Sequence, residues 1–350
     1  LVLIALIIGW PVSSSLAAQA KPMSVAELAL YKGKDRETIL IEGAKKEAQV
    51  TFYTSNTWMA GYVSQEFGRK YPFIKTNVWR SDSKELLKRL TDEAAAGRYI
   101  ADVVETSPDY MALLIPANMF QELFSPELGP YDNNVKAKGK NGVFHWTSRE
   151  LYISLGFNTN LIPPAEAPKV MKDLLEPKWK SKMTIAGTTT GTQWIGALID
   201  TNGREFIEKL SAQEINVQNM SGAALSGLVA SGEVPLSPTI FNSNIFTHKQ
   251  KGAPVDWRPL DPVIAGVGIS GMVANSPHPH AALLFLDYLH SKDGQQAAMK
   301  GGLSSPRNDI GSLEQKFKKF YIESKFTPEE FEKKIEEWDA MMRKYFIRKR

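Results

Sequence analysis

The chain has 350 residues, no cysteine, and 42 basic against 38 acidic side chains, which gives a formal net charge of +4. Charges of both signs are mixed along the sequence, and this argues against nucleic-acid binding, which needs a basic face. Without cysteine the chain can form neither a disulfide nor a cysteine-linked lipid anchor.

The amino terminus has the pattern of an export signal. Residues 1–8 are apolar, Pro11 and the serines at 13–15 interrupt this run, and Ala18–Ala20 has the small-x-small spacing of a cleavage site. The run is shorter than a membrane span, which needs roughly 20 apolar residues. We therefore predict a signal peptide over residues 1–20, truncated at its start because Met and a basic region are missing, and a mature periplasmic protein of a Gram-negative bacterium.

The first half of the mature chain alternates strands with helices. Strands are predicted over residues 50–53, 76–79 and 101–106, and helices over 61–70, 84–97 and from 107 onward. Ser83 is the predicted N-cap of the second helix, and Gly97 its stop. This alternation predicts an α/β fold with a parallel sheet covered by helices on both faces, which binds ligands at the carboxyl ends of its strands.

The second half repeats the pattern. Strands are predicted over 151–158, 182–186, 234–236 and 263–273, a loop over Gly187–Thr192, and helices over 193–200, 221–231 and 279–289. Thr327 is the expected N-cap of a terminal helix, and the basic stretch from Arg343 is expected to be a frayed, solvated tail. About 330 residues follow residue 20, more than the ~250–300 that one core usually holds, so two lobes are expected.

Short segments that follow one another along the chain carry a family resemblance. They are Gly43–Ser55, Ala101–Val104, Ile153–Leu161, Asp173–Lys180, Gly232–Val234, Gly252–Trp257 and Ser276–Gln296. Together they resemble the periplasmic solute-binding proteins of ABC importers, in the branch that contains the ferric-ion binders. The Asp-Leu-Leu and Pro-Lys-Trp-Lys elements of the fourth segment are among the most specific features of that family.

The resemblance implies an architecture and a set of partners. The fold is expected to be the two-lobed type II periplasmic-binding-protein fold, with residues 44–147 and 263–307 in lobe 1, residues 148–262 in lobe 2, and a charged helical extension over 308–350. The segments near 148–158 and 260–273 should form a hinge that closes over a small-molecule ligand. The implied partners are an inner-membrane permease and its ATPase; the protein should be a monomer, with no catalytic activity, no cofactor and no nucleic-acid partner.

The iron ligands of the ferric branch have no counterparts here. Its His, its carboxylate and its two adjacent tyrosines fall at about Thr57, Ser107 and the pair Asn242 and Ser243. Ferric iron favours anionic oxygen ligands, and four neutral side chains do not supply them. No metal site is therefore predicted.

The loops at the expected cleft are rich in hydroxyl and amide groups. The candidate ligand-binding residues are Ser55, Asn56, Thr57, Thr106, Ser107, Thr188, Thr189, Thr190, Gly191, Thr192, Asn242 and Asn244. Several precede a helix, where exposed N–H groups and the helix dipole favour an anion. The loop from Gly187 to Thr192 is the strongest candidate, because glycine lets the backbone approach a ligand closely. The alternative is that these residues are only N-caps and turns.

Two arginines and an aromatic residue complete the candidate site. Arg80 and Arg149 could hold a carboxylate, phosphonate or sulfonate in a bidentate fork, against the alternative of a salt bridge. Tyr152 is predicted to wall the cleft, as are Trp58 and Trp194, against the alternative of core packing. The sequence thus predicts capture of an oxyanion-bearing solute, with a ferric or metal-chelate binder, a sugar or polyol binder and a periplasmic enzyme as alternatives.

The enzyme alternative has little support in the sequence. His278 and His280 flank Pro279 at a helix start, without the i, i+4 spacing of a helical metal pair. His145, His248 and His290 lie outside any nucleophile motif. Gly266–Gly271 has the spacing of a dinucleotide loop but lies inside an apolar strand, so the required strand–loop–helix context is absent.

Overall fold

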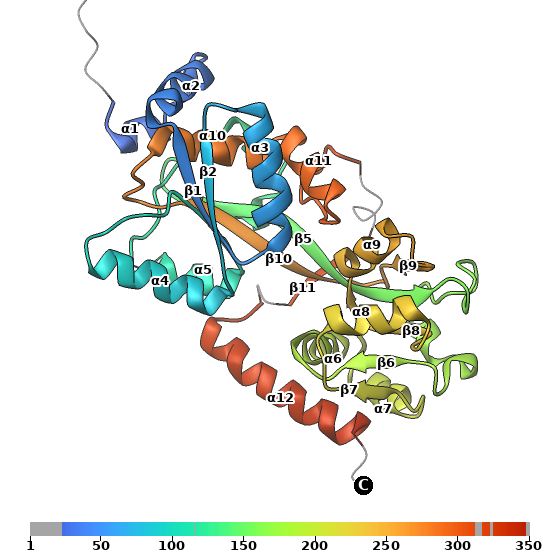
Figure 1. Ribbon diagram of the computed structural model, residues 1–350. Coiled ribbons are helices and arrows are strands. Elements are labelled where there is room, and N and C mark those ends of the chain that lie inside the picture. Colours follow the sequence, from blue (N-terminus) through green and yellow to red (C-terminus); the bar gives the residue numbers. More distant parts are fainter. Residues whose placement is uncertain (1–22, 116, 312–316, 323–324, 348–350) are drawn as a thin grey trace, which may run out of the picture.

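A computed structural model describes residues 23–115, 117–311, 317–322 and 325–347. The predicted signal peptide lies outside the described residues. Two α/β lobes are joined by long strands that run from one lobe into the other (Figure 1). In the described part of the chain, no helix is long and apolar enough to cross a membrane.

Lobe 1 is built on a sheet with the strand order β2-β1-β3-β10-β5-β4. Its own strands are β1 (Gln49–Thr54), β2 (Lys75–Arg80), β3 (Val103–Thr106) and β4 (Lys136–Lys138). The first three are mutually parallel, as the βαβ alternation predicts. One face packs on the core that contains Phe52, Phe67 and Phe285, and the other on the core that contains Tyr53 and Leu86.

Helices cover both faces of the lobe 1 sheet (Figure 1). They are α1 (Val25–Ala29), α2 (Arg36–Glu47), η1 (Met59–Val63), α3 (Ser64–Lys70), α10 (Pro279–His290) and α11 (Lys292–Lys300) at the first core, and α4 (Ser83–Ala95) and α5 (Pro108–Leu114) at the second. The N-cap of α4 is Asp82, whose carboxylate accepts from Glu85 N at 2.9 Å, so the predicted cap at Ser83 is wrong by one residue. Gly97 has a φ of +64°, which suits its predicted role after the helix.

Two antiparallel strands cross between the lobes. β5 (Val143–Asn158) has 16 residues and pairs with β10 (Val263–Met272) along most of its length. β5 begins eight residues before the predicted strand at 151, because it serves both lobes: its first half pairs with β4 and its second half with β8 (Leu236–Phe241) and β9 (Val255–Arg258). The predicted strand over 234–236 is right only at its last residue, because β8 begins at Leu236.

Lobe 2 completes its β-structure with β6 (Thr184–Ala186) and β7 (Asn216–Gln218), which pair in parallel. Its helices are α6 (Thr189–Asn202), α7 (Arg204–Ser211), α8 (Gly222–Ser231) and α9 (Asn242–Gln250), and the Asp173–Lys180 motif forms the short turns η4 (Met171–Leu175) and η5 (Pro177–Trp179). The predicted helix over 193–200 begins four residues too late. Gly191 lies in the first turn of α6, where a Cβ would meet Ala186 O at 1.8 Å, so its glycine allows the turn to pack against β6.

The carboxyl-terminal segment belongs to lobe 2. β11 (Lys319–Tyr321) pairs with β10, and α12 (Pro328–Phe346) lies against α6. The predicted N-cap Thr327 forms a capping box with Glu330. Arg343 and Lys344 are exposed as predicted, but the tail is not frayed as far as Phe346, because the helix continues to that residue and its side chain is buried in the lobe 2 core.

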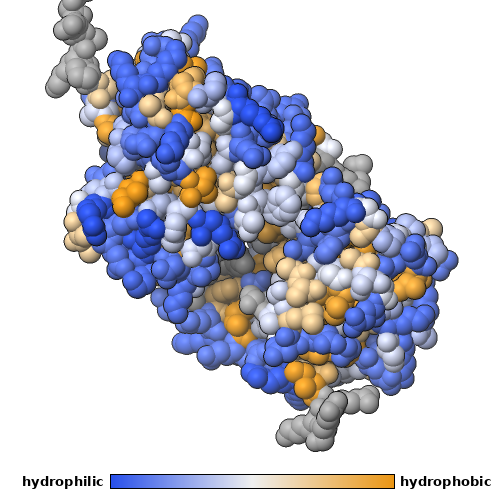
Figure 2. Space-filling view, viewed as in Figure 1, coloured by the Kyte–Doolittle hydropathy of each residue, from blue (hydrophilic) through white to orange (hydrophobic). Residues whose placement is uncertain are grey.

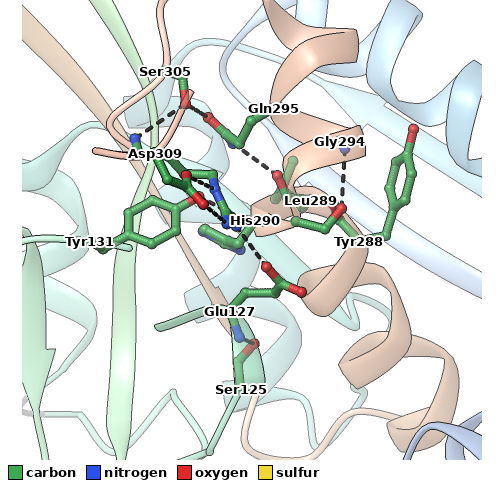
Figure 3. Close-up of polar contacts among 12 residues, drawn as sticks. Ser125, Glu127, Tyr131, Tyr288, Leu289, His290, Gly294, Gln295, Ser305 and Asp309 are labelled. Carbon is green, nitrogen blue, oxygen red and sulfur yellow. Dashed lines mark hydrogen bonds and ion pairs between the residues drawn. The ribbon is translucent and has the colours of Figure 1, made fainter. Parts of the chain in front are cut away.

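A buried polar network fixes the segment that follows α11. Arg307 Nη1 donates to the carbonyl of His290 at 2.7 Å and to Glu127 at 2.6 Å, and Arg307 Nε donates to Asp309 at 2.9 Å. The Gln295 amide nitrogen donates to the carbonyl of Leu289, and its amide oxygen accepts from Ser305 (Figure 3). These bonds attach residues 305–309 to the end of α10, so the chain returns to lobe 2 from a fixed position.

The buried His290, at the end of α10, is expected to make the stability of the folded protein depend on pH. Burial lowers the pKa of its imidazole to about 3, whereas the unfolded residue titrates near 6.5. Below that pH the unfolded chain binds the extra proton, so stability is lost as pH falls. The difference in free energy of unfolding between wild type and His290→Gln should shrink by about 1.4 kcal/mol per pH unit below about pH 6.5. Urea unfolding across this range measures it.

The matched control is His280→Gln, because His280 is only half-buried at the other end of the same helix. Buried acids such as Asp287 contribute equally to wild type and variant and therefore cancel in the difference. A His290→Gln difference that stays constant with pH would contradict the prediction.

Candidate functional site

The carboxyl ends of the strands in the two lobes face each other. β3 ends at Thr106, beside Ile269 of β10, which pairs in turn with Thr147 of β5. β8 ends at Phe241, beside Ile153 of β5. Since β6 runs parallel to β8, both lobes direct these ends toward the stretch of β5 between Thr147 and Ile153, which spans about 20 Å. The molecular surface is hollowed between the lobes (Figure 2). This is where ligands bind in open α/β sheets.

The loop after β1 is held by its own side chains. Asn56 Oδ1 accepts from the N–H groups of Trp58 and Met59 at 2.9 and 3.0 Å, and Asn56 N donates to Thr54 Oγ1 at 3.0 Å. Asn56 therefore acts as a local cap. Ser55 is half-buried and Thr57 is exposed, so these two residues present their side chains to solvent at the end of β1.

A buried ion pair lies at the end of β3. Arg149 Nε donates to Glu105 Oε1 at 2.8 Å, and both side chains are buried. Thr54 Oγ1 donates to the other oxygen of Glu105. A Cβ at Gly268 would lie 2.0 Å from Glu105, so glycine at that position of β10 makes room for the pair. Glu105 was not among the residues predicted from the sequence, although it directly precedes Thr106.

The other predicted residues at the strand ends of lobe 1 are Thr106, Ser107 and Arg80. Thr106 is buried, and its hydroxyl has no hydrogen-bond partner in the described part of the chain. Ser107 Oγ donates to Ser83 Oγ at 3.3 Å. Arg80 is exposed at the end of β2.

The first turn of α6 contributes backbone and hydroxyl groups. The initial N–H groups of a helix have no intrahelical acceptor, and here they belong to Thr189, Thr190 and Gly191. Thr188 Oγ1 donates to the carbonyl of Met220 at 3.1 Å. Thr190 is 8% exposed, and its Oγ1 has no partner among the described residues. Thr192 is buried one residue past Gly191.

The start of α9 is tied to the crossing strand. Asn242 Oδ1 accepts from Tyr152 N at 2.9 Å, and its amide nitrogen donates to Ser304 Oγ at 3.3 Å. Asn242 is buried, whereas Asn244 is half-buried. Asn242 therefore connects α9 to β5 and to the segment after α11.

Two of the three aromatic candidates lie in cores. Tyr152 is buried and donates to Glu150 at 2.6 Å, and Trp194 is buried in the lobe 2 core. Trp58 is half-buried and packs against the lobe 1 core. Tyr152 and Trp194 therefore fit the alternative of core packing.

The paired histidines hold a helix start. His278 Nδ1 lies 3.0 Å from Asp102, and its other ring nitrogen contacts Gln49 rather than a nucleophile. His280 Nδ1 lies 2.7 Å from Glu47, which also accepts from Ala281 N at 2.8 Å. Carboxylates at a helix N-terminus satisfy its free N–H groups. The described residues contain no group of three or more His, Cys, Asp or Glu side chains that could hold a metal ion.

A family model described as bacterial extracellular solute-binding protein matches residues 63–319. The chain belongs to this family. A curated relative of this solute-binding protein, the Fe(3+)-binding periplasmic protein of Serratia marcescens, is 24% identical over 260 residues, which cover 69% of this chain and 71% of the relative.

Solved structures show the same fold as this solute-binding protein. Iron-bound HitA from Pseudomonas aeruginosa has a TM-score of 0.62 at 20% identity and covers 85% of this chain and 99% of its own. AfuA from Actinobacillus pleuropneumoniae, with fructose-6-phosphate bound, has a TM-score of 0.63 at 19% identity and covers 85% and 98%. The fold is therefore the type II periplasmic-binding-protein fold, and the protein is a solute-binding component of the ABC-transporter class rather than an enzyme.

Proposed function

We propose that this solute-binding protein captures a small oxyanion-bearing solute, such as a carboxylate, phosphonate or sulfonate, in the cleft between its lobes. Capture takes place in the periplasm, and the loaded protein delivers the solute to a permease and ATPase of an ABC importer. It acts as a monomer, and closure of the lobes about β5 and β10 encloses the solute.

The first turn of α6 is the observation that carries the proposal. It combines free helix N–H groups with the buried Thr190 hydroxyl, which lacks a partner among the described residues. A bound oxyanion would accept from these donors and gain from the helix dipole. The site needs no charged side chain in this turn, which agrees with its threonine-rich sequence.

Arg149 supports the same assignment from lobe 1. Its Nε holds Glu105, and no hydrogen bond from Nη1 or Nη2 reaches another described residue. These terminal nitrogens are available as donors, while Glu105 fixes the plane of the guanidinium. The fructose-6-phosphate bound to AfuA shows that a fold of this kind accommodates a phosphate-bearing solute.

The experiment is a thermal-shift screen followed by calorimetry. A bound ligand raises the apparent stability, so carboxylates, phosphonates, sulfonates, sugar phosphates and neutral polyols can be compared directly. Thr190→Val keeps the side-chain shape and removes the hydroxyl. It should weaken binding of the selected oxyanion about 10-fold, because a hydrogen bond to a charged group contributes roughly 1.5–3 kcal/mol.

Thr91→Val is the matched control, since Thr91 is exposed on α4. Small-angle scattering should show compaction on saturation with the same ligand. Equal affinity of Thr190→Val and wild type would contradict binding of the oxyanion at the first turn of α6. Selection of a neutral polyol in the screen would support the sugar alternative instead.

Ferric ion is expected not to bind tightly. The positions that match the iron ligands of the ferric branch hold Thr57, Ser107, Asn242 and Ser243, and the Asn242 side chain is already bonded within the protein. Neutral oxygen and nitrogen donors do not compensate a hard trivalent cation. Titration with ferric citrate should therefore produce no charge-transfer band in the visible range. A red complex that resists mild chelators would contradict this prediction.

A further inference from the structure

A cavity lies beside the crossing strands β5 and β10. Its volume is about 500 Å³, within the range of small-molecule sites. β5 contributes His145 and Thr147 to its wall, and β10 contributes Val267 and Ile269. Lys136 of β4 and Phe320 of β11 also line it. The cavity therefore meets strands from both lobes.

This cavity is on the opposite face of the sheet from the Glu105 and Arg149 pair. A Cβ on Gly268 would meet both of those side chains, so Gly268 points to their face. Ile269 is the next residue, and successive residues of a strand point to opposite faces. Ile269 pairs with Thr147, and both line the cavity. The sheet thus separates the cavity from the Glu105 and Arg149 pair. Thr106, which pairs with Ile269, points to the face of the cavity, and Pro108, which follows the candidate residue Ser107, also lines it.

His145 gives the cavity an unused polar group. It is 9% exposed, and neither ring nitrogen has a hydrogen-bond partner among the described residues. Burial lowers the pKa of its imidazole to about 4, so the ring is neutral at pH 7 and offers one donor and one acceptor. Buried polar groups are rarely left unpaired in native proteins, which points to a partner that enters the cavity.

The charged groups of the wall are all basic. Lys136, Lys319 and Lys325 line the cavity, and no described residue of its wall is acidic. Lys319 and Lys325 are paired with Glu150 and Asp200, whereas Lys136 has no ion pair within the described residues. Burial and the neighbouring Lys138 lower the pKa of Lys136, and the attraction of Asp132, which lies outside the wall of the cavity, does not cancel their effect. An anionic group of a ligand beside Lys136 would compensate its positive charge.

We propose that this cavity is a second binding site, for an organic anion with a compact apolar or aromatic body. The anionic group binds Lys136, a polar atom of the ligand pairs with His145, and the body packs on Val267, Ile269 and Phe320. Charge complementarity selects the anion, and the apolar floor on β10 selects a hydrophobic body over a hydrated inorganic ion. The proposal does not depend on which solute occupies the cleft.

The test uses anilinonaphthalene sulfonate, a fluorescent aromatic anion, with the folded full-length chain at neutral pH. We expect saturable binding at one site. Ile269→Trp, which fills the cavity, should weaken binding about 10-fold or more, and Lys136→Gln about 5-fold. Val78→Trp and Lys46→Gln are the matched controls, because both residues are exposed in lobe 1, and they should bind as wild type does.

Two further variants keep the outcome decisive. If Ile269→Trp does not fold, as judged by circular dichroism, Val267→Phe fills the same space. Thr190→Val in α6 should leave probe binding unchanged, because that residue belongs to the cleft. Probe affinity within about 2-fold of wild type in both Lys136→Gln and a folded filling variant would overturn the proposal. Weakening by Thr190→Val would assign the probe to the cleft and would also overturn it.

Discussion

Trp338→Ala is expected to lower the free energy of unfolding of lobe 2 by about 3–5 kcal/mol, the usual cost of deleting a large buried aromatic side chain. Trp338 is 3% exposed, and its ring lies 5.9 Å from that of Phe326 and 6.1 Å from that of Phe331. A Cβ on Gly196 would lie 2.3 Å from the indole, so α6 accepts the ring only because glycine faces it. The substitution leaves a cavity between α6 and α12.

Urea unfolding of wild type and variant measures the effect. Glu332→Ala is the control, since Glu332 is exposed on the same helix, and its effect should stay within about 0.5 kcal/mol. A change of that small size in Trp338→Ala would contradict the packing of α12 on lobe 2. Gly196→Leu should act in the same direction as Trp338→Ala, because it forces the two helices apart.

The packing of α12 could have been found in the sequence. Phe331, Ile335, Trp338 and Met342 recur every three or four residues, which is the spacing of one apolar helix face. High charge on the other face favours the prediction of a charged extension with a frayed, solvated end. The cap at Thr327 was predicted because it depends only on local sequence, whereas the partner of the apolar face depends on tertiary structure.

The predicted starts of α6 and β5 are wrong because local sequence does not show the tertiary contacts made there. The threonines before Gln193 have modest helix propensity and suggested a loop, but packing of Gly191 against Ala186 places them in the first turn of α6. The strand β5 was predicted only over its continuous apolar half. Its first half carries Arg149 and Glu150, whose charges are compensated by Glu105 and Lys319 from distant parts of the chain.

The candidate site was predictable as a set of loops but not as a set of contacts. Predicted strand ends and helix starts make Thr57, Ser107 and Thr190 candidates from the sequence alone. The bonds that occupy Asn242 and Arg149 join residues far apart in the chain, and no local pattern encodes them. The same limit applies to His145, an isolated histidine in the sequence, which lines a cavity only after five separate segments have assembled.

Arg149→Met is expected to destabilise the protein by about 3–5 kcal/mol, because it leaves the carboxylate of Glu105 buried without its counter-ion. Arg149 and Glu105 are both buried, and the Thr54 hydroxyl is the other side-chain donor to Glu105 among the described residues. The double variant Glu105→Gln/Arg149→Met removes both charges. It should recover at least half of the lost stability, since replacing a whole buried pair is far less costly than breaking it.

The double variant also separates the structural role of Arg149 from ligand binding. If the Nη groups of Arg149 bind the oxyanion, the refolded and stable double variant should still bind it about 10- to 150-fold more weakly than wild type does, as expected for a lost charge-assisted hydrogen bond. Calorimetry with the ligand selected in the screen measures this loss, and Glu105→Gln alone shows how much of it comes from the carboxylate. Wild-type affinity in the double variant would show that Arg149 only compensates the charge of Glu105. The anion would then be bound by the first turn of α6 without Arg149.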